Sequence, residues 1–262
     1  NNQIRNMKVL EEIEKKTLKN FRSLGAVSIF FYKIIKYSIT PKWHFNIIFQ
    51  QLLKIGFLSI PVIGMTAVFT GGALALQIFI GSSRWSAVDT VPSIVVLGIT
   101  RELGPVLTAL MVAGRISSAI AAELGTMRVT EQIDALKTLS TNPFRYLIAP
   151  RVIASIISLP ILTLIFDIIG VFGGYLTSVY SLDFNSSTYI IKTIDFMKMN
   201  DVSSGLIKSI FFGFIIGSIG CYYGYNSSNG AEGVGKATTN AVVIASILIF
   251  IFNYLMTEIF FV

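Results

Sequence analysis

Charge-free apolar stretches alternate with short charged connections over most of the chain. Five stretches are long enough to cross a bilayer, which takes about 20 apolar residues in a helix. They cover residues 55–83, 103–122, 152–182, 209–231 and 237–257. Only two of them contain a charged residue, Arg115 and Asp167 respectively. Because a backbone inside lipid must satisfy its own hydrogen bonds, each crossing is predicted to be helical. The pattern predicts an all-α, polytopic membrane protein with about five transmembrane helices.

Two further segments are expected to lie at the membrane surface. Residues 86–100 are apolar but short and contain Pro92, so we expect a re-entrant or interfacial segment that leads into the next crossing. Residues 23–53 mix aromatic residues with lysines, a combination typical of the headgroup layer. They predict an N-terminal interfacial helix, interrupted at Pro41. A basic N-terminal region, residues 1–54, would then precede a transmembrane domain over residues 55–262.

Lysine and arginine are unevenly distributed between the two sides of these crossings. Residues 1–54 carry ten of the 21, residues 123–151 carry four, and residues 232–236 carry one. Since cytoplasmic segments hold the excess of positive charge, the N-terminus is predicted to be cytoplasmic, or stromal in a plastid. Five crossings place the C-terminus on the far side. The chain opens with Asn1 rather than Met, and we expect its natural start to lie further upstream.

Composition excludes several classes of protein. The chain is 53% hydrophobic and 13% charged, against about 25% charged in ordinary soluble domains. This excludes a disordered chain and a nucleic-acid-binding domain, and orientation in a membrane accounts for the net charge of +7. Cys221 and His44 are single residues of their types, so no internal disulfide and no Cys/His zinc site can form. We expect no metal, no cofactor and no catalytic residue.

Charged residues at membrane depth are the main candidates for function. Arg101 and Glu102 precede Gly104 at the head of the second crossing. Such residues are rare inside a membrane and usually functional. They either anchor the helix at the headgroup level or form the polar rim of a substrate pocket. For Lys208, at the start of the fourth crossing, snorkelling to the interface is the simplest interpretation.

Arg115 lies halfway along the second crossing and cannot lose its charge. It predicts an intramembrane ion pair, with Asp167 as the candidate partner and Glu123 as the alternative. Small residues recur every fourth position on the same segment, at Ala109, Ala113, Ser117 and Ala121, and again at Gly114, Ser118 and Ala122. They permit close approach of helices, either within one subunit or at the seam of a homodimer.

The connection after the second crossing predicts a short amphipathic helix over residues 126–139. Its first turn carries Thr130 as N-cap, followed by Glu131, Gln132 and Asp134. Its apolar residues share one face, namely Val129, Ile133, Leu136 and Leu139. This cytoplasmic helix either rests on the membrane surface or docks a soluble partner.

The sequence offers no complete nucleotide-binding motif. Residues 230–236 fit G-x-x-x-x-G-K, but Ala237 stands where a phosphate loop needs Ser or Thr to hold magnesium. No strand is predicted before this loop. We therefore expect that the chain is not an enzyme.

Residues 101–154, RELGPVLTALMVAGRISSAIAAELGTMRVTEQIDALKTLSTNPFRYLIAPRVIA, resemble the characteristic region of the MlaE/YrbE-type permease family. The resemblance continues in FTGGALALQ upstream, and in GLIKSIFFGFIIGSIGCYYGY and NGAEGVGKATTNAVV downstream. It covers residues 45–260 in the same order. Members of this family are membrane subunits of ABC-type lipid transporters. They form homodimers with two copies of a separate ATPase and associate with an MCE-type substrate-binding protein.

The resemblance implies roles for several residues. The 126–139 helix becomes the coupling helix seated on the ATPase subunit. Arg101 and Glu102 lie near the path of a phospholipid or glycolipid, and Lys208 matches a lysine of the family. An ATP-independent channel or ion-coupled transporter, using Arg115 and Asp167, is an alternative, as is a scaffold that recruits a soluble partner. Richness in Ile, Asn, Lys and Phe suggests a plastid-encoded algal protein of the inner envelope membrane, with a bacterial inner membrane as the alternative.

Overall fold

The fold is taken from a computed structural model, which describes residues 25–40, 44–84, 86–228 and 230–261. Within these ranges every regular element is a helix. Five helices are long and apolar enough to cross a membrane, and they cover Phe45–Ser83, Val88–Val129, Phe144–Ser181, Met199–Tyr225 and Ala231–Phe261. The predicted all-α class with five transmembrane helices is confirmed.

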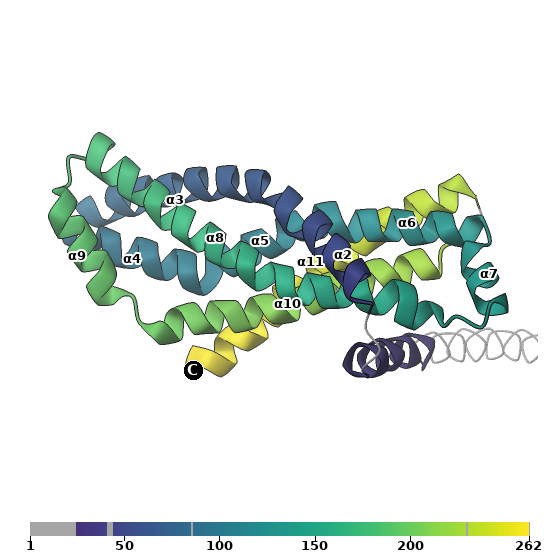
Figure 1. The fold of residues 1–262 in the computed structure, drawn as a ribbon. Helices are drawn as coiled ribbons and strands as arrows, with labels where there is room; N and C mark the ends of the chain where they lie inside the picture. Colours follow the sequence, from purple (N-terminus) through teal and green to yellow (C-terminus); the bar gives the residue numbers. More distant parts are fainter. Residues whose placement is uncertain (1–24, 41–43, 85, 229, 262) are drawn as a thin grey trace, which may run out of the picture.

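The long helices run side by side along one axis and form an elongated bundle (Figure 1). The α-helices are α2 (Phe45–Ile55), α3 (Ile60–Ser83), α4 (Val91–Gly98), α5 (Gly104–Val112), α6 (Ser118–Val129), α7 (Gln132–Thr138), α8 (Ala149–Ser181), α9 (Ser186–Phe196), α10 (Met199–Tyr225) and α11 (Ala231–Phe261). The central helices are α8 and α10, which pack on each other; α3 covers α8, and α6 and α11 cover α10. The short helices α7 and α9 lie at opposite ends of the bundle (Figure 1).

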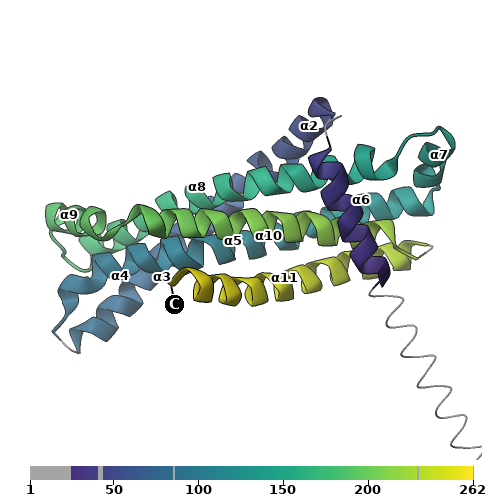
Figure 2. The same ribbon diagram turned by 90° about the horizontal axis from the view of Figure 1, so that it is seen from below.

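The N-terminal helix over residues 25–39 crosses the bundle near the end that carries α7 (Figure 2). Its Phe30 and Ile34 are buried. The Phe30 ring stands edge-on to Phe144, with ring centroids 5.2 Å apart, and to Tyr222 at 5.3 Å. Some of the aromatic residues expected in the headgroup layer therefore pack against the protein itself. The predicted interruption at Pro41 lies outside the described residues.

The first span begins earlier than the apolar pattern indicates. α2 starts at Phe45 and continues through a 3-10 turn, η1 (Phe57–Ser59), into α3. Gly56 joins α2 to this turn, and its N–H donates to the Leu52 carbonyl at 2.7 Å. The expected boundary at residue 54 thus falls inside a continuous helical segment.

The second span also begins earlier, because residues 88–129 form one continuous helix. Pro92 occupies the first turn of α4, where a missing N–H costs nothing, so it starts the helix rather than breaking it. Val91, Val95 and Ile99 are buried, and α4 packs against α3 and α9. Residues 88–100 therefore lead into the second crossing without a break in the helix, while their position as a re-entrant or interfacial segment stays a prediction.

Three turns of π-helix occur in the spans, two within the second span and one at the start of the third. They are η3 (Ile99–Leu103), η4 (Ala113–Ser117) and η5 (Phe144–Ile148). A π turn accommodates one additional residue and so rotates the helix face that follows; such turns are frequent at functional sites. η3 contains Arg101 and Glu102, and η4 contains Arg115.

Glycine allows the central helices to approach closely. A methyl group added to Gly71 of α3 would overlap the backbone carbonyl of Gly170 on α8. On α10, a methyl group at Gly213 would lie 2.6 Å from the carbonyl oxygen of Ser155 on α8. Gly220 of α10 faces the helix that contains Ser117 in the same way.

The first of the two predicted rows of small residues on the second span also allows helices to approach closely. Its members Ala109, Ala113, Ser117 and Ala121 are all buried within the protomer. Of the second row, Gly114 is exposed, and a methyl group there would meet no atom within 4 Å. Close packing within one subunit therefore accounts for the first row, whereas in the second row Gly114 is uncovered and Ser118 and Ala122 are half-buried.

These contacts predict different costs for the same substitution at two positions of α3. Gly71→Ala forces α3 and α8 apart, and we expect it to reduce the free energy of unfolding by about 1–3 kcal/mol. Gly81→Ala is the matched control, because a methyl group at Gly81 meets no atom within 4 Å. It should change stability by less than about 1 kcal/mol. Thermal unfolding of the purified variants in detergent measures both, and equal shifts would contradict the proposed packing.

Candidate functional site

Arg101 and Glu102 each form an ion pair with α10. The Arg101 Nη2 lies 2.6 Å from Asp201 Oδ1, and its Nε donates to the same oxygen at 2.8 Å. The Lys208 Nζ lies 2.8 Å from Glu102 Oε1. Asp201 and Lys208 are seven residues apart and so lie on one face of α10. Two adjacent residues of η3 thereby bind two positions on that face that lie about two turns apart.

Lys208 is completely buried and uses all three of its ammonium protons. Besides Glu102, its Nζ donates to the Arg101 carbonyl oxygen at 3.0 Å and to Thr257 Oγ1 at 2.8 Å. Pro105 has no N–H and so cannot serve the Arg101 carbonyl four residues earlier in the helix. Lys208 supplies a donor there. A buried ammonium is tolerated here because each proton has an acceptor.

α11 completes this charged network, which comprises Arg101, Glu102, Asp201, Lys208, Asn253 and Thr257. The Asn253 Nδ2 donates to Glu102 Oε2 at 2.8 Å, and Thr257 Oγ1 donates to Glu102 Oε1 at 2.8 Å. The Arg101 guanidinium also lies 4.3 Å from the ring centroid of Phe261. Three segments distant in sequence, η3, α10 and α11, are joined by these contacts.

The sequence predicts Arg101, Glu102 and Lys208 near a lipid path, which stays a prediction, and it does not predict the contacts among them; the expected snorkelling of Lys208 is wrong. Lys208 does not snorkel, and it presents no free charge to a ligand, because its side chain has 0% exposure and is fully paired. Arg101 and Glu102 remain partly exposed. The residues missed were Asp201, Asn253 and Thr257. Two spacings in the sequence could have indicated them. Asp201 lies seven residues before Lys208, and Asn253 and Thr257 lie four residues apart in an otherwise apolar run, so each pair shares one helix face.

The predicted ion pair between Arg115 and Asp167 does not form. The Arg115 Nη1 donates to Ser59 Oγ at 2.6 Å. Asp167 instead lies against Gly104. Gly104 is eleven residues before Arg115, or ~16 Å along a helix at 1.5 Å per residue, which is too far for a pair.

The alternative partner, Glu123, is also wrong. Its carboxylate lies 3.1 Å from Lys54 Nζ and 3.0 Å from Arg151 Nη2. These contacts connect α6 to α2 and α8 near the α7 end of the bundle. Glu123 thus pairs with Lys54 and Arg151, two helical turns beyond Arg115, and not with Arg115.

At the α7 end, the predicted N-cap is displaced by one residue. Thr130 ends α6, and its hydroxyl donates to the Thr126 carbonyl at 2.9 Å. Glu131 is the N-cap residue of α7 and has a left-handed backbone with φ of 59°. This conformation is uncommon for a residue other than glycine, and here it turns the chain between the two helices.

Asp134 holds this turn together. Its carboxylate lies 2.7 Å from Lys137 Nζ and 2.9 Å from Arg128 Nη1. The hydrogen bond from Lys137, with the charge of Arg128, lowers the pKa of the Asp134 carboxyl from its usual value. Asp134 is therefore engaged within the hairpin formed by α6 and α7.

The apolar side of α7 faces the protein. Ile133 is fully buried, and Leu136 packs against the core, whereas Leu139 beyond the helix is 75% exposed. Glu131 and Gln132 are exposed. The outward side of this helix is consequently mainly polar.

Comparison with known proteins adds independent support. The model of the family described as permease MlaE matches residues 48–259. A Rickettsia bellii protein named "Probable ABC transporter permease protein" is 56% identical over 97% of this chain and 98% of its own. An Arabidopsis thaliana protein, "TRIGALACTOSYLDIACYLGLYCEROL 1, chloroplastic", is 38% identical over 90% of this chain and 67% of its own. The Haemophilus influenzae "Intermembrane phospholipid transport system permease protein MlaE" is 32% identical over 96% and 97%. The family resemblance of the sequence is thereby confirmed, and the chain belongs to the MlaE permease family.

Proposed function

We propose that this chain is the membrane-spanning permease subunit of an ABC-type transporter of phospholipid or glycolipid, energised by a separate ATPase subunit. Two relatives support the proposal by name, one as an ABC transporter permease and one as a phospholipid transport permease. The incomplete phosphate loop at residues 230–237 agrees with nucleotide hydrolysis by a separate subunit. By analogy with the family, two copies of this chain and an MCE-type substrate-binding protein complete the assembly.

The orientation of α7 is the observation that carries the coupling role. A helix that rests on a membrane turns its apolar side outward to the lipid. In α7 the apolar Ile133 is buried inward, and Glu131 and Gln132 face out. This arrangement favours a soluble partner over the membrane surface. Of the expected coupling residues, Glu131 and Gln132 would touch the ATPase, whereas Thr130, Asp134 and Leu136 would hold the helix in place.

A continuous helix connects this docking surface to the charged network. Residues 88–129 include η3, with Arg101 and Glu102, and end at the turn into α7. From Glu102 to Val129 the helix spans ~40 Å at 1.5 Å per residue. We propose that ATP-driven closure of the ATPase subunits displaces α7 and moves this helix. The partly exposed Arg101 would then exchange Asp201 for the phosphate of a lipid headgroup.

The homodimer and the orientation in the membrane belong to the same proposal. The row that includes Gly114 and Ser118 would approach a second copy, since Gly114 is exposed, Ser118 is half-buried and no described residue covers Gly114. The end that carries α7 and the N-terminal helix would face the cytoplasm or stroma. An ion-coupled transporter receives less support, because Arg115 and Asp167 do not meet.

The sequence leaves two locations open, a bacterial inner membrane and a plastid inner envelope membrane, and the relatives include both a bacterial and a chloroplastic protein. The bacterial relative is 56% identical and the chloroplastic one 38% identical, each over most of this chain. The higher identity favours a bacterial inner membrane, and the composition favours a plastid inner envelope membrane. Immunogold labelling of the source cells decides between them.

The coupling role predicts that Glu131→Lys weakens the contact with the ATPase subunit. We expect the ATPase activity of the reconstituted complex and its lipid transfer between vesicles to fall together, by about tenfold for a loss of roughly 1.4 kcal/mol of binding. Asp195→Lys is the control, because it introduces the same charge at an exposed position of α9, at the opposite end. Full activity of the Glu131 variant would refute the assignment of α7.

The charged network predicts that Lys208→Met is severe. It leaves Glu102 without its cation, and we expect a loss of about 3–5 kcal/mol in stability together with loss of lipid transfer. Lys192→Met is the matched control, because Lys192 pairs with the exposed Asp89 at 2.8 Å. It should cost less than about 1 kcal/mol.

A double variant separates stability from transport. Lys208→Met combined with Glu102→Gln removes both charges, so most of the lost stability should return. Lipid transfer should stay low, because the ion pair that joins α10 to the helix over residues 88–129 is gone. Chemical unfolding and vesicle transfer assays measure the two effects. Restored transfer in the double variant would show that the Lys208–Glu102 pair serves only folding.

A further inference from the structure

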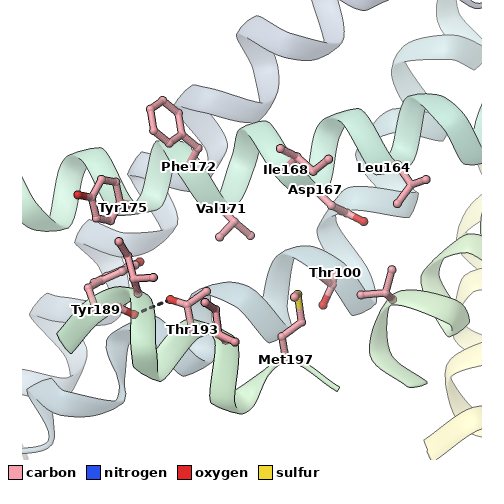
Figure 3. Close-up of a pocket in the computed structure, with 13 residues that line it drawn as sticks. Thr100, Leu164, Asp167, Ile168, Val171, Phe172, Tyr175, Tyr189, Thr193 and Met197 are labelled. Carbon is pink, nitrogen blue, oxygen red and sulfur yellow. Dashed lines mark hydrogen bonds between the residues drawn. The ribbon is translucent and has the colours of Figure 1, made fainter. Parts of the chain in front are cut away.

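A groove opens between α8 and α9, on the part of α8 nearest the α9 end of the bundle (Figure 3). Its volume is about 570 Å³, within the range of about 300–1,000 Å³ that is usual for small-molecule sites. Ile168 and Phe172 of α8 form one wall, and Ile190 and Ile194 of α9 form the other. The walls are therefore hydrocarbon over most of their length.

Asp167 lies at the inner end of this groove, next to Thr100, and is 6% exposed. Its Oδ1 accepts no hydrogen bond, and the carboxyl forms no ion pair with any described residue. Figure 3 shows Asp167 directed from α8 toward the segment that holds Thr100. The Thr100 hydroxyl donates to the Val96 carbonyl at 2.9 Å, so it does not serve the carboxyl.

Two arginines of the second span, Arg101 and Arg115, are also engaged elsewhere. Arg101 pairs with Asp201, and Arg115 donates to Ser59. A buried carboxyl without a partner is costly in an apolar environment, and at membrane depth such residues are usually functional. Gly104 permits this placement, because a methyl group there would overlap the Asp167 Oδ1. A hydrogen-bond donor from outside the chain would complete the arrangement.

The surroundings of the groove indicate which molecule brings that donor. α8 belongs to a membrane span, so a ligand that enters from the side comes from the lipid phase. Ile168 at the edge of the groove is 68% exposed and Phe172 is 54% exposed, which offers an apolar entrance. An acyl chain fits such walls, and the polar end of the same molecule would reach Asp167.

We propose that this groove is a lateral lipid-binding site, which holds one acyl chain between α8 and α9 and a hydroxyl or ammonium group at Asp167. The site lies within one protomer and does not depend on the proposed transport, the ATPase or a second copy. Its lining includes Thr100 and Val202, the sequence neighbours of Arg101 and Asp201. A lipid bound there would lie directly behind the charged network.

Photolabelling of the full chain tests this site. The chain is placed in phosphatidylcholine nanodiscs, whose lipid has no hydroxyl or N–H donor. It is exposed to a monoacylglycerol or to an alkylamine, each with a diazirine on the same alkyl chain. Mass spectrometry maps the labelled residues. We expect labelling concentrated in α8 and α9, around the groove, with either probe or both.

Variants that fill the groove provide the decisive comparison. Val171→Trp from α8 and Ile190→Trp from α9 should each lower this labelling about tenfold, which corresponds to roughly 1.4 kcal/mol of binding. Ile161→Trp is the matched control, because Ile161 is exposed on α8 outside the groove. Thermal unfolding identifies any variant that fails to fold. If one filling variant fails to fold, the other one, from the opposite wall of the groove, still tests the site. Labelling that neither filling variant reduces would overturn the site.

Substitution of Asp167 tests the polar end and distinguishes the two headgroups. Asp167→Leu removes the acceptor and should lower labelling by the preferred probe about tenfold. Asp167→Asn keeps an acceptor but no charge, so it should spare the monoacylglycerol and reduce the alkylamine. Labelling that is unchanged in Asp167→Leu would overturn the role of the carboxyl. Because no ATPase or ATP is present, failure here is independent of failure of the transport proposal.

Discussion

The ion pair between Lys208 and Glu102 joins α10 to the helix over residues 88–129, and the arrangement of α11 depends on it. An ammonium without access to water needs an acceptor for every proton. Here the acceptors come from Glu102, from the carbonyl of Arg101 and from Thr257. These demands fix the rotation of three helices at once. Apolar side chains alone can pack at many rotations of a helix about its axis, whereas this ion pair restricts the rotation.

Close helix packing makes that arrangement possible. Gly205 brings α10 against the backbone at Thr100, next to Arg101, and Gly104 brings the helix after η3 against Asp167. Away from the network, Gly71 and Gly213 bring α3 and α10 against α8. Membrane helices gain no hydrophobic energy from association inside lipid, so they depend on such contacts. Polar pairing specifies the geometry, and small residues provide the room for it.

The sequence predicts the spans and the central charges well, because a charge in an apolar run is conspicuous. It predicts their partners poorly, because pairing depends on helix rotation and register. Arg115 and Asp167 looked complementary, yet they lie at different depths of the bundle. The π turn at Ile99–Leu103 sets the directions of Arg101 and Glu102, and no local pattern reveals it. Likewise, the left-handed backbone of Glu131 moved the start of α7 past Thr130.

The charged network contains two cations and two anions, so Arg101, Glu102, Asp201 and Lys208 sum to zero. The transmembrane voltage acts on net charge, at about 2.3 kcal/mol per elementary charge for each 100 mV. Displacing this cluster as a unit along the membrane normal therefore performs no electrical work. A step that moves the four residues together would therefore proceed equally well in a de-energised membrane and in one at full potential.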